Sequence, residues 1–567
     1  MAALHPADQI VLLVYLIGIT LLGVWAARGV RSMGDFFMPR RFGKWMLVMH
    51  AFGTGTHSDQ AVGVASKTFT NGLSGIWYQW LWLLCTPFYW LIAPMMRRFR
   101  ALTMADVFVA RFGRSVGVLF AVVGSVNLMV NIGVMLKGSG AVISSAFGHA
   151  VSTDTVIAAM TLMFLVYGIA GGLAAAIVTD FFQGILTVVF SFLMLPFVLS
   201  AVGGIDGIRA VLDDPQMFSL VVPREIGLFY ILVIAGNGLI GIVTQPHIKG
   251  NCAAGRSEMD GRVGFTAGNF IKRVCTIAWS LTGLAAAAYL IGQSVDPDEV
   301  YGVMARDFLP AIMPGLLGVF VASLLASVMS SCDSFMIASS ALVTENVYKP
   351  WRPAQSDRHY LGVGRLVAVL VVAGGVAFAF WLPGVVEGLE IFWKIPSIMG
   401  LAFWLGFFWR RMTVAGAWTT TAVAFLTWWA TTLPQVVAWI AGLPVADALR
   451  LVVSSAGSAH LYLPWQMICY LTAGAAAGIA VSLVTRPTPE SQLESFYALA
   501  RTPVEAGEGD PPAPCTLPQG VRVQARCSLI SRGGLEIPVP NRLSAVGFLI
   551  SSFLVVMLIA SFFAITQ

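Results

Sequence analysis

Charged residues are scarce in this chain. Asp, Glu, Lys and Arg make up only 11% of its 567 residues, whereas soluble domains carry roughly 25%. Cysteine is also rare: the seven cysteines include no C-x-x-C pair, so neither a disulfide framework nor a metal cage is indicated. An H-E-x-x-H metalloprotease motif and a phosphate loop ending in Lys-Ser or Lys-Thr are missing as well. These absences exclude an ordinary soluble domain and argue against an enzyme.

Hydrophobic sequence fills the chain instead. Hydrophobic residues make up 57% of it, and the mean hydropathy is +0.80. Runs near 20 residues long, enough to cross about 30 Å of hydrocarbon, recur from end to end, and we count about fourteen. They lie at about 9–27, 45–67, 73–96, 116–147, 153–170, 173–202, 226–248, 265–293, 310–344, 361–382, 386–409, 413–441, 463–485 and 543–565. We therefore predict an all-α polytopic protein of the cell membrane, surrounded by the lipid bilayer.

Basic residues are distributed unevenly among the predicted loops. No Lys or Arg precedes the first run, whereas several follow it at once. Alternate loops further along are basic too, and in one of them we place Arg256, Lys272 and Arg273. Because Lys and Arg gather in cytoplasmic loops, we predict that both termini lie outside. The net charge of +6 then reflects the inner loops and is no evidence for nucleic-acid binding.

A line of hydroxyl groups marks the run between residues 315 and 348. Four serines of this run share one face of an α-helix, at positions i, i+3, i+4 and i+7: Ser327, Ser330, Ser331 and Ser334. An unpaired polar group in hydrocarbon costs several kcal/mol, so this face must look into the protein. Such oxygens suit a hard monovalent cation. Close helix packing through small residues is the alternative.

Glycine and polar residues interrupt two of the runs at corresponding places. The first interruption covers residues 53–60, and the second comprises Gly236, Asn237, Gly238 and Gly241 within the seventh run. Breaks that lie five spans apart indicate two five-helix repeats of inverted topology, at about 45–202 and 226–409. Unwound backbone at such breaks frees carbonyl groups for cations, and half-helix N-termini attract anions. Glycines that merely allow close packing are the alternative.

A long connection separates the last two runs. Residues 487–540 are rich in proline and glycine and cannot bury a core, so we expect an inner loop with one short helix near 491–499. The last span follows at about 543–565 and returns the C-terminus to the outside.

Several motifs resemble those of the sodium:solute symporter family, which includes the sodium–glucose, proline, pantothenate and sialic acid transporters. The run GIAGGLAAAIVTDFFQ at 168–183 is similar to the signature GG-L-x-A-V-x-x-T-D-x-x-Q, and LLASVMSSCDSFMIASSALVTENVY resembles the ninth-span motif. ALTMADVFVARFG, which ends at Gly113, looks like an inner-loop pattern of the family. The resemblance implies the five-plus-five inverted-repeat transporter fold, with one leading helix and about three trailing ones.

The resemblance also implies where a sodium ion binds. Its ligands would be the backbone carbonyl groups of Gly53, Thr56 and Ser327 and the hydroxyl groups of Ser330 and Ser331. Asp180, in the T-D-x-x-Q motif, resembles the carboxylate that some members use for a second sodium ion. A structural hydrogen-bonding role for Asp180 is the alternative.

Polar residues within the predicted spans are the candidates for binding a solute. Gln60 and Asn237 match positions at which the family's sugar transporters place substrate-binding amides. His57 is suited to donate to a substrate or, with Asp59, to relay protons; a polar cluster that lines a wet cavity is the alternative. Lys137 is suited to neutralise a carboxylate substrate. The alternatives are that its amino group extends to the membrane surface or that it pairs with an Asp.

Three functions remain for this chain. The first is sodium-coupled uptake, by alternating access, of a small polar organic solute of the sugar, sialic acid, carboxylate, amino acid or vitamin class. The second is proton-coupled transport on the same scaffold through His57 and Asp59. The third is a transporter-like solute sensor, which would need a signalling domain for which residues 487–540 are too short and too poor in apolar sequence. We expect the first, with sodium as the coupling ion and no obligate protein partner.

Overall fold

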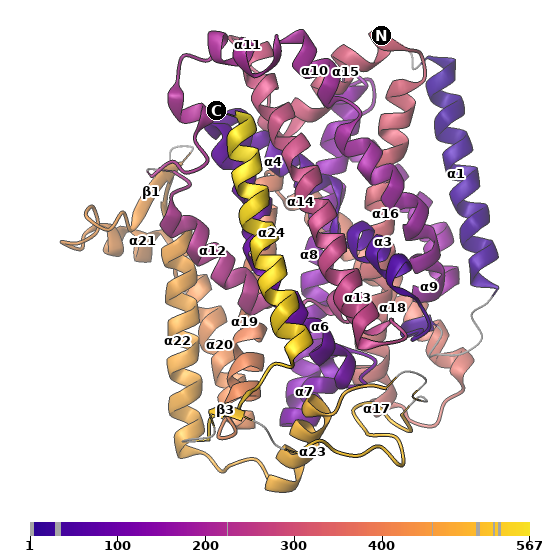
Figure 1. Cartoon of the computed structure of the whole chain (residues 1–567), viewed down its shortest axis with the longest axis vertical. Helices are drawn as coiled ribbons and strands as arrows, with labels where there is room; N and C mark the ends of the chain where they lie inside the picture. The colour runs from indigo at the N-terminus through magenta and orange to yellow at the C-terminus, as the bar shows by residue number, and fades with distance from the viewer. Residues whose placement is uncertain are drawn as a thin grey trace.

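Helices that run along the long axis of the molecule form nearly all of the structure (Figure 1). The computed structural model describes residues 5–28, 36–223, 225–455, 458–505, 508, 511–525, 528–530 and 534–566. Within these ranges the strands form two small antiparallel hairpins: β1 (Val452–Ser455) with β2 (Ser458–Leu461), and β3 (Ser528–Ile530) with β4 (Ile537–Pro538). The β1–β2 hairpin projects from the side of the helical body, whereas the β3–β4 hairpin lies at its lower end (Figure 1).

Eight helices among the described residues are long and apolar enough to cross a membrane: Pro6–Ala26, Arg114–Ala146, Gly172–Ala201, Leu316–Trp351, Asp357–Trp381, Val385–Phe408, Leu463–Val484 and Arg542–Thr566. Two bent pairs raise the number to as many as ten. Leu228–Thr244 meets Pro246–Ala253 at 70°, and Val414–Ala430 meets Pro434–Ala441 at 77°. The chain is therefore an all-α polytopic membrane protein, as predicted. The remaining predicted runs fall on helices that are shorter, broken or charged.

The first half of the chain begins with α1 (Pro6–Ala27), which packs against α9 and α16 at the edge of the bundle. The elements that follow are α3 (Lys44–Gly55), α4 (Ser58–Asn71), η1 (Gly72–Ile76), α5 (Trp77–Cys85), η2 (Thr86–Phe88), α6 (Tyr89–Arg98), α7 (Met104–Phe112), α8 (Arg114–Ala146), α9 (Thr153–Phe192), α10 (Leu195–Ala201) and α11 (Gly204–Val211). Two predicted runs merge into α9, which changes direction at Gly172, where φ is 61°. A Cβ atom there would lie 2.5 Å from the ring of Phe36, so this close approach requires glycine.

The second half repeats the pattern of short and long helices. Its elements are η3 (Pro215–Phe218), α12 (Leu228–Gly241), η4 (Ile242–Thr244), α13 (Pro246–Ala253), α14 (Glu258–Tyr289), η5 (Pro297–Glu299), α15 (Val300–Ile312), α16 (Leu316–Val343), η6 (Thr344–Tyr348), α17 (Lys349–Trp351), α18 (Asp357–Trp381), α19 (Val385–Phe408), α20 (Val414–Ala430), α21 (Pro434–Ala441), α22 (Leu463–Val484), α23 (Glu490–Arg501) and α24 (Arg542–Thr566).

The first membrane break lies where the sequence places it. Helix α3 ends at Gly55, α4 begins at Ser58, and the two residues between them have extended backbone, with φ and ψ of −124° and 104° at Thr56 and −128° and 163° at His57. Glycine is a poor helix former and a β-branched threonine favours extended backbone, so the helix ends here. Asp59 in the first turn of α4 then complements the positive end of the new helix.

The second break lies later in the sequence than predicted. Residues 236–238 remain helical within α12, and the backbone turns extended at Gln245, whose φ and ψ are −75° and 115°. Pro246 supplies the reason, because a proline disfavours helical backbone in the residue before it and starts a helix well itself. The glycines of α12 serve packing instead: a Cβ atom on Gly238 would lie 3.2 Å from Trp82.

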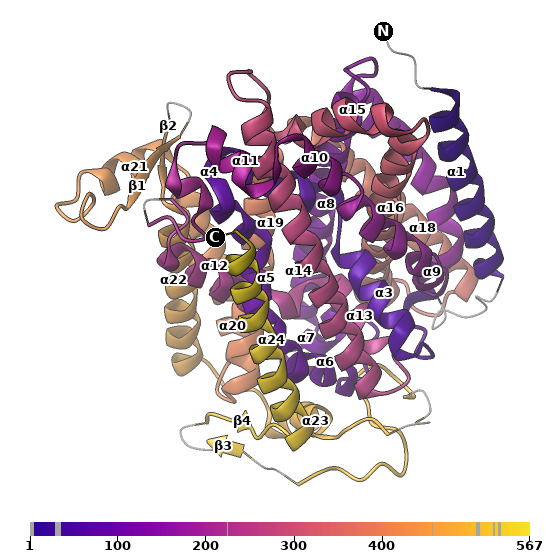
Figure 2. The same ribbon diagram turned by 45° about the horizontal axis from the view of Figure 1, so that its top comes forward.

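The two ends of the molecule differ in what they carry. Helices α7, α17 and α23 and the β3–β4 hairpin gather at one end, whereas α10, α11 and α15 gather at the other (Figure 1). The chain starts and finishes toward that second end, and the turned view in Figure 2 shows the same arrangement.

Candidate cation and solute site

The serine face of α16 meets the end of α3 at the first break. The Ser331 Oγ atom lies 3.2 Å from the carbonyl oxygen of Gly53, 3.3 Å from that of Thr54 and 3.2 Å from that of Ser327. A hydroxyl group has one proton, so it cannot satisfy three acceptors at once. These groups are fully buried and shielded from bulk water. The carbonyl oxygens therefore keep lone pairs that could coordinate a cation.

Gly53 permits this contact between the helices. A Cβ atom at this position would lie 2.8 Å from the Ser330 Oγ atom and 3.5 Å from the Asp180 carbonyl oxygen. Any larger residue would therefore push α3 away from α9 and α16. The amide of Thr56 donates to the Gly53 carbonyl at 3.2 Å, and the Thr56 hydroxyl is buried without a hydrogen-bond partner in the described part of the chain.

Asp180 lies behind the serine face and gathers polar groups from two other helices. Ser330 Oγ donates to its Oδ1 atom at 2.5 Å, and His50 Nδ1 lies 2.5 Å from its Oδ2 atom. Thr54 Oγ1 lies 3.1 Å from Ser334 Oγ and 3.4 Å from Asp180 Oδ2. A buried carboxylate needs such partners, because an unpaired charge in the interior is costly. The cluster thus ties α3, α9 and α16 together.

His50 is a member of this cluster that the sequence analysis missed. Its side chain is fully buried, and its Nε2 atom has no hydrogen-bond partner among the described residues. The sequence does carry a signal for His50. Residues 50 and 54 are four apart, so they lie on one face of the helix that ends at the break. One buried histidine in an apolar run is, by itself, too common a feature to mark a site.

A small cavity, of about 40 Å³, borders the other side of the break. Its polar lining comes from three places, the α3–α4 break, the start of α13 and the middle of α14: Gly55, His57, Gln60, Gln245, His247, Asn251, Asn269, Lys272 and Arg273. Aromatic side chains complete the wall, among them Trp82, Tyr89, Phe335 and Phe392. A mixed polar and aromatic lining of this kind is typical of sites for small organic ligands.

Several buried polar atoms around this cavity lack hydrogen-bond partners within the described structure: Gln60 Oε1, His247 Nδ1, and both side-chain polar atoms of Asn251. Buried polar groups are nearly always paired, so unpaired ones that line one cavity indicate a polar ligand or water there. His57 is held in place by its Nδ1 atom, 2.5 Å from Asp59 Oδ1, and its Nε2 atom lies 3.2 Å from the Gln60 amide nitrogen.

The other two residues predicted to bind solute lie elsewhere. The Asn237 amide donates to the Trp393 carbonyl at 2.8 Å and accepts from the Tyr470 hydroxyl at 2.5 Å, so that it joins α12 to α19 and α22. Lys137 lies on α8, partly exposed, and is not among the cavity-lining residues. Roles in solute binding for these two residues stay predictions.

The structure corrects the position of two basic residues. Lys272 and Arg273, which the sequence analysis placed in an inner loop, lie within α14 and are nearly fully buried. Helix α14 starts earlier than the apolar run suggests, because Ser257 and Asp260 cap it reciprocally. Lys272 therefore lies about four turns inside the helix. Its amino group donates to the carbonyl oxygen of Gly55 at the break.

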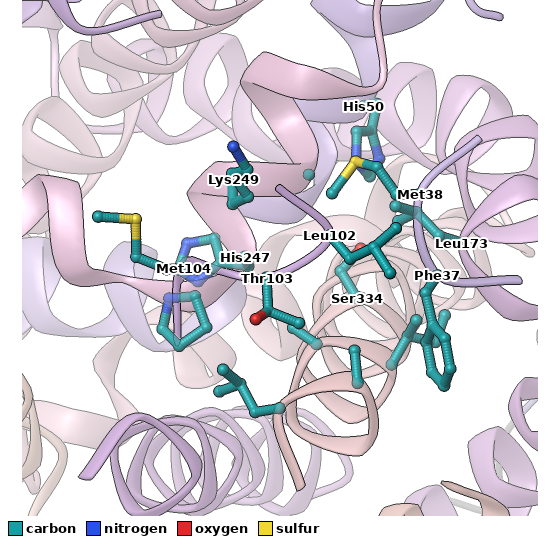
Figure 3. A pocket seen from close by; sticks show the side chains of 16 residues that line it. Phe37, Met38, His50, Leu102, Thr103, Met104, Leu173, His247, Lys249 and Ser334 are labelled. Carbon is teal, nitrogen blue, oxygen red and sulfur yellow. The ribbon is translucent and has the colours of Figure 1, made fainter. Parts of the chain in front are cut away.

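A second small cavity, of about 30 Å³, lies beside His50 and Ser334 (Figure 3). Leu102, Thr103 and Met104 line it as well, so it faces the end of the molecule that carries α7. His247 lines both cavities. Its ring packs against Phe335, with 4.5 Å between the ring centroids, while His57 approaches the same phenylalanine at 5.9 Å.

A membrane bundle with two broken helices, carbonyl oxygens that face a serine row and a polar cavity beside the break is the architecture of a secondary transporter. The comparison with protein families agrees. The model of the sodium:solute symporter family matches residues 36–423, and the chain belongs to this family.

Individual relatives support this assignment. The chain is 26% identical over 510 residues to the osmoregulated proline transporter OpuE of Bacillus subtilis (strain 168), covering 86% of this chain and 97% of the relative. It is 24% identical over 454 residues to a sodium/glucose cotransporter of Vibrio parahaemolyticus, covering 72% and 82%. A solved structure of a Na⁺-coupled sialic acid symporter shares the fold, with a TM-score of 0.69 at 18% identity over 85% of this chain and 98% of that one.

The chain is thus a multi-pass membrane protein that couples transport of a solute to sodium, and the first of the three expected functions is confirmed. None of these comparisons favours proton coupling or a sensor role.

Proposed function

We propose that the coupling sodium ion binds between the α3–α4 break and the serine face of α16. The ligands would be the carbonyl oxygens of Gly53, Thr56 and Ser327 with the hydroxyls of Ser330 and Ser331. The single observation that carries this proposal is the convergence on the Ser331 hydroxyl of the carbonyl oxygens of Gly53 and Ser327, two of the proposed ligands, together with that of Thr54. Neutral oxygens beside the buried carboxylate of Asp180 are the ligands that a hard cation prefers.

The proposed site spans the two repeats, which we take to be residues 45–202 and 226–409. Helix α3 belongs to the first repeat and α16 to the second. An ion held between them favours the arrangement in which both sets of oxygens converge, and its loss favours arrangements in which the helices part. This difference in affinity between two arrangements is the physical basis of coupling.

Asp180 has two roles open to it. In the structure its carboxylate accepts from Ser330 and contacts His50, so we propose that it fixes the orientation of a sodium ligand. The alternative is a second sodium ion on Asp180, which would have to displace at least one of these partners.

We propose further that a small polar organic solute binds in the cavity beside Gln60 and His57. Relatives bear the names of proline, glucose, pantothenate and myo-inositol transporters. These solutes share small size and polarity, and the proposed solute class is drawn from those two properties. The protein would act as a transporter rather than an enzyme, in the cell membrane. Both termini would face outward, and the α7–α23 end would face the cytoplasm, because its loops are basic.

Purified protein in proteoliposomes tests the sodium site. We expect solute uptake that depends on an inward sodium gradient, and we expect Ser331→Ala to weaken the sodium dependence while the protein remains folded. Sodium dependence that is unchanged in Ser331→Ala would refute the proposed position of the ion.

A further inference from the structure

Arg100 lies in the turn between α6 and α7, residues 99–103, which we name the corner. Its side chain is fully buried, and each of its five N–H donors has an acceptor. These acceptors are both carboxylate oxygens of Glu508, at 2.5 and 2.7 Å, and the carbonyl oxygens of Arg98, Thr502 and Pro503, at 2.9, 3.2 and 3.0 Å. Four of the five belong to the segment that follows α23. We name its described residues, 502–505 and 508, the strap.

The corner borders the second cavity. Leu102 and Thr103 of the corner line this cavity, together with Met104 at the start of α7 (Figure 3). His247 lines the same cavity and also borders the proposed solute cavity. A solute that leaves its cavity past His247 in the direction of the α7 end therefore meets the corner next.

Two other parts of the chain also hold the corner in place. Thr103 Oγ1 donates to Asn346 Oδ1 at 2.7 Å, and the Asn346 amide donates to Asp106 Oδ1 at 2.6 Å, so that the corner and α7 are joined to η6 at the end of α16. Arg40 Nη2 donates to the carbonyl oxygens of Arg100 and Ala101 at 3.0 and 3.3 Å. Elements of both proposed repeats thus meet at the corner, and alternating access requires such elements to part.

The strap bridges the same two repeats. Through Arg100 it holds the first repeat, and the Val504 amide donates at 3.0 Å to Glu258 Oε1, at the start of α14 in the second repeat. The backbone of Arg100 is left-handed, with a φ of 51°. A residue with a side chain keeps this strained conformation only when its surroundings impose it, and strained residues of this kind are found in segments that switch. The strap is part of the restraint on Arg100.

From this arrangement we infer that the corner is the gate at the α7 end of the transport path and that the strap holds this gate closed. The inference rests on the proposed function and deepens it, because it names the contact that opens before the solute leaves. When Glu508 leaves, the Arg100 guanidinium is a buried charge without its counter-ion, which the protein interior disfavours. Arg100 then turns toward water and the corner moves with it. A segment outside the transport path therefore sets how often the gate opens.

Thiol labelling of the full-length protein in detergent tests the inference. Ala341→Cys places a thiol in the wall of the second cavity, where Ala341 is buried on α16. N-ethylmaleimide is the probe, in sodium or choline buffer, and peptide mass spectrometry reports the introduced thiol separately from the native cysteines. We expect Glu508→Gln to raise the labelling rate at position 341 at least about tenfold over the chain that carries Ala341→Cys alone, because a broken buried ion pair favours the open corner.

Two controls separate opening of the gate from a general loss of stability. Glu505→Gln is the matched variant, since Glu505 is an exposed acid of the same strap, and it should leave the labelling rate unchanged. Cys332 is a native thiol that is fully buried on the same helix and is not among the cavity-lining residues, so its labelling should not rise in Glu508→Gln. An equal gain in Glu505→Gln, or a gain at Cys332 as large as at position 341, overturns the inference.

Hydrogen exchange in the wild-type chain decides the question if Glu508→Gln does not fold. The amides of Leu102 and Thr103 donate to Asp106 Oδ2, and the Val504 amide donates to Glu258. If the strap and the corner open as one unit, these amides share one opening free energy and exchange in parallel. A strap that exchanges while the corner stays protected would show that the strap does not hold the gate.

Failure of the proposed function gives a different result. By that proposal sodium favours one arrangement of the helices, so labelling at position 341 should differ between sodium and choline in both chains. Equal labelling in the two buffers counts against the sodium site, whereas the ratio between Glu508→Gln and its parent chain still judges the strap. A labelling rate that Glu508→Gln leaves unchanged overturns the strap alone.

Discussion

The hydroxyl of Ser330 donates to the carboxylate of Asp180 at 2.5 Å and thereby joins α16 to α9 in the interior of the bundle. One of the proposed sodium ligands is therefore oriented by a carboxylate. Such preorganisation lowers the cost of assembling a site.

Asp180→Asn distinguishes the two roles proposed for this carboxylate. If Asp180 only orients Ser330, the Hill coefficient for sodium should stay the same in the variant while the apparent affinity falls. If Asp180 holds a second ion, a Hill coefficient near two in the wild type should fall to about one, because the coefficient is bounded by the number of sites. Sodium titrations of uptake in proteoliposomes measure both quantities.

Ser331→Ala removes the hydroxyl on which three carbonyl oxygens converge. We expect sodium affinity to fall at least tenfold, about 1.4 kcal/mol, with expression unchanged. Ser339→Ala is the matched control, because the Ser339 hydroxyl is buried on the same helix and bonded to its own Met336 carbonyl at 2.9 Å. An equal loss of sodium affinity in both variants would indicate a general disturbance of α16.

Gly53→Ala tests how closely α3 and α16 must approach. The added Cβ atom would lie 2.8 Å from Ser330 Oγ, and we expect overpacking to cost about 1–3 kcal/mol of stability and to weaken sodium binding. Ser330→Ala in the same chain should relieve part of the stability loss, as a double-mutant cycle on Tm would show.

Gly55→Ala is the control for this pair, because a Cβ atom there would meet nothing within 4 Å. The structural reason given for Gly53 fails if both glycine variants lose the same stability.

His57→Gln separates a proton relay from a pocket residue. The His57 ring borders the cavity and contacts Gln60 and Asp59, so we expect the variant to change solute affinity while sodium-driven uptake persists. Uptake measured with an imposed proton gradient in the absence of sodium should stay at background in both proteins. Abolished transport in the variant, together with proton-driven uptake in the wild type, would favour the relay.

The α23 end offers a prediction about pH. Arg410 contacts Glu490, Glu494 and Glu536 there, and its hydrogen bond holds the pKa of Glu494 below the ordinary value of 4.5. A depressed carboxyl pKa contributes stability above that ordinary value, and the contribution is lost as the pH falls through the lowered pKa. Hydrogen exchange in α23 should therefore rise at acid pH beyond the intrinsic rate, and this pH effect should be weaker in Arg410→Gln.

The contact between the end of α3 and the serine face of α16 could be predicted from the sequence because it depends on local pattern. The serine spacing indicates one helix face, and Gly53 with Thr56 marks the end of α3. The part that could not be predicted depends on how distant helices meet. The charged residues before the apolar run obscured the start of α14 and therefore the position of Lys272 within it. No pattern in the residues around Asn237 indicates its partners on α19 and α22. The second break was misplaced because Pro246 outweighs the glycines of α12.

His247 lines both the solute cavity and the cavity that faces the α7 end. Its imidazole therefore borders both spaces, and the ring is tilted at 45° against that of Phe335. If this imidazole is what separates the two cavities, a change of its rotamer would connect them without movement of a helix. The residue at position 247 would then set the rate of solute release independently of the affinity for the solute.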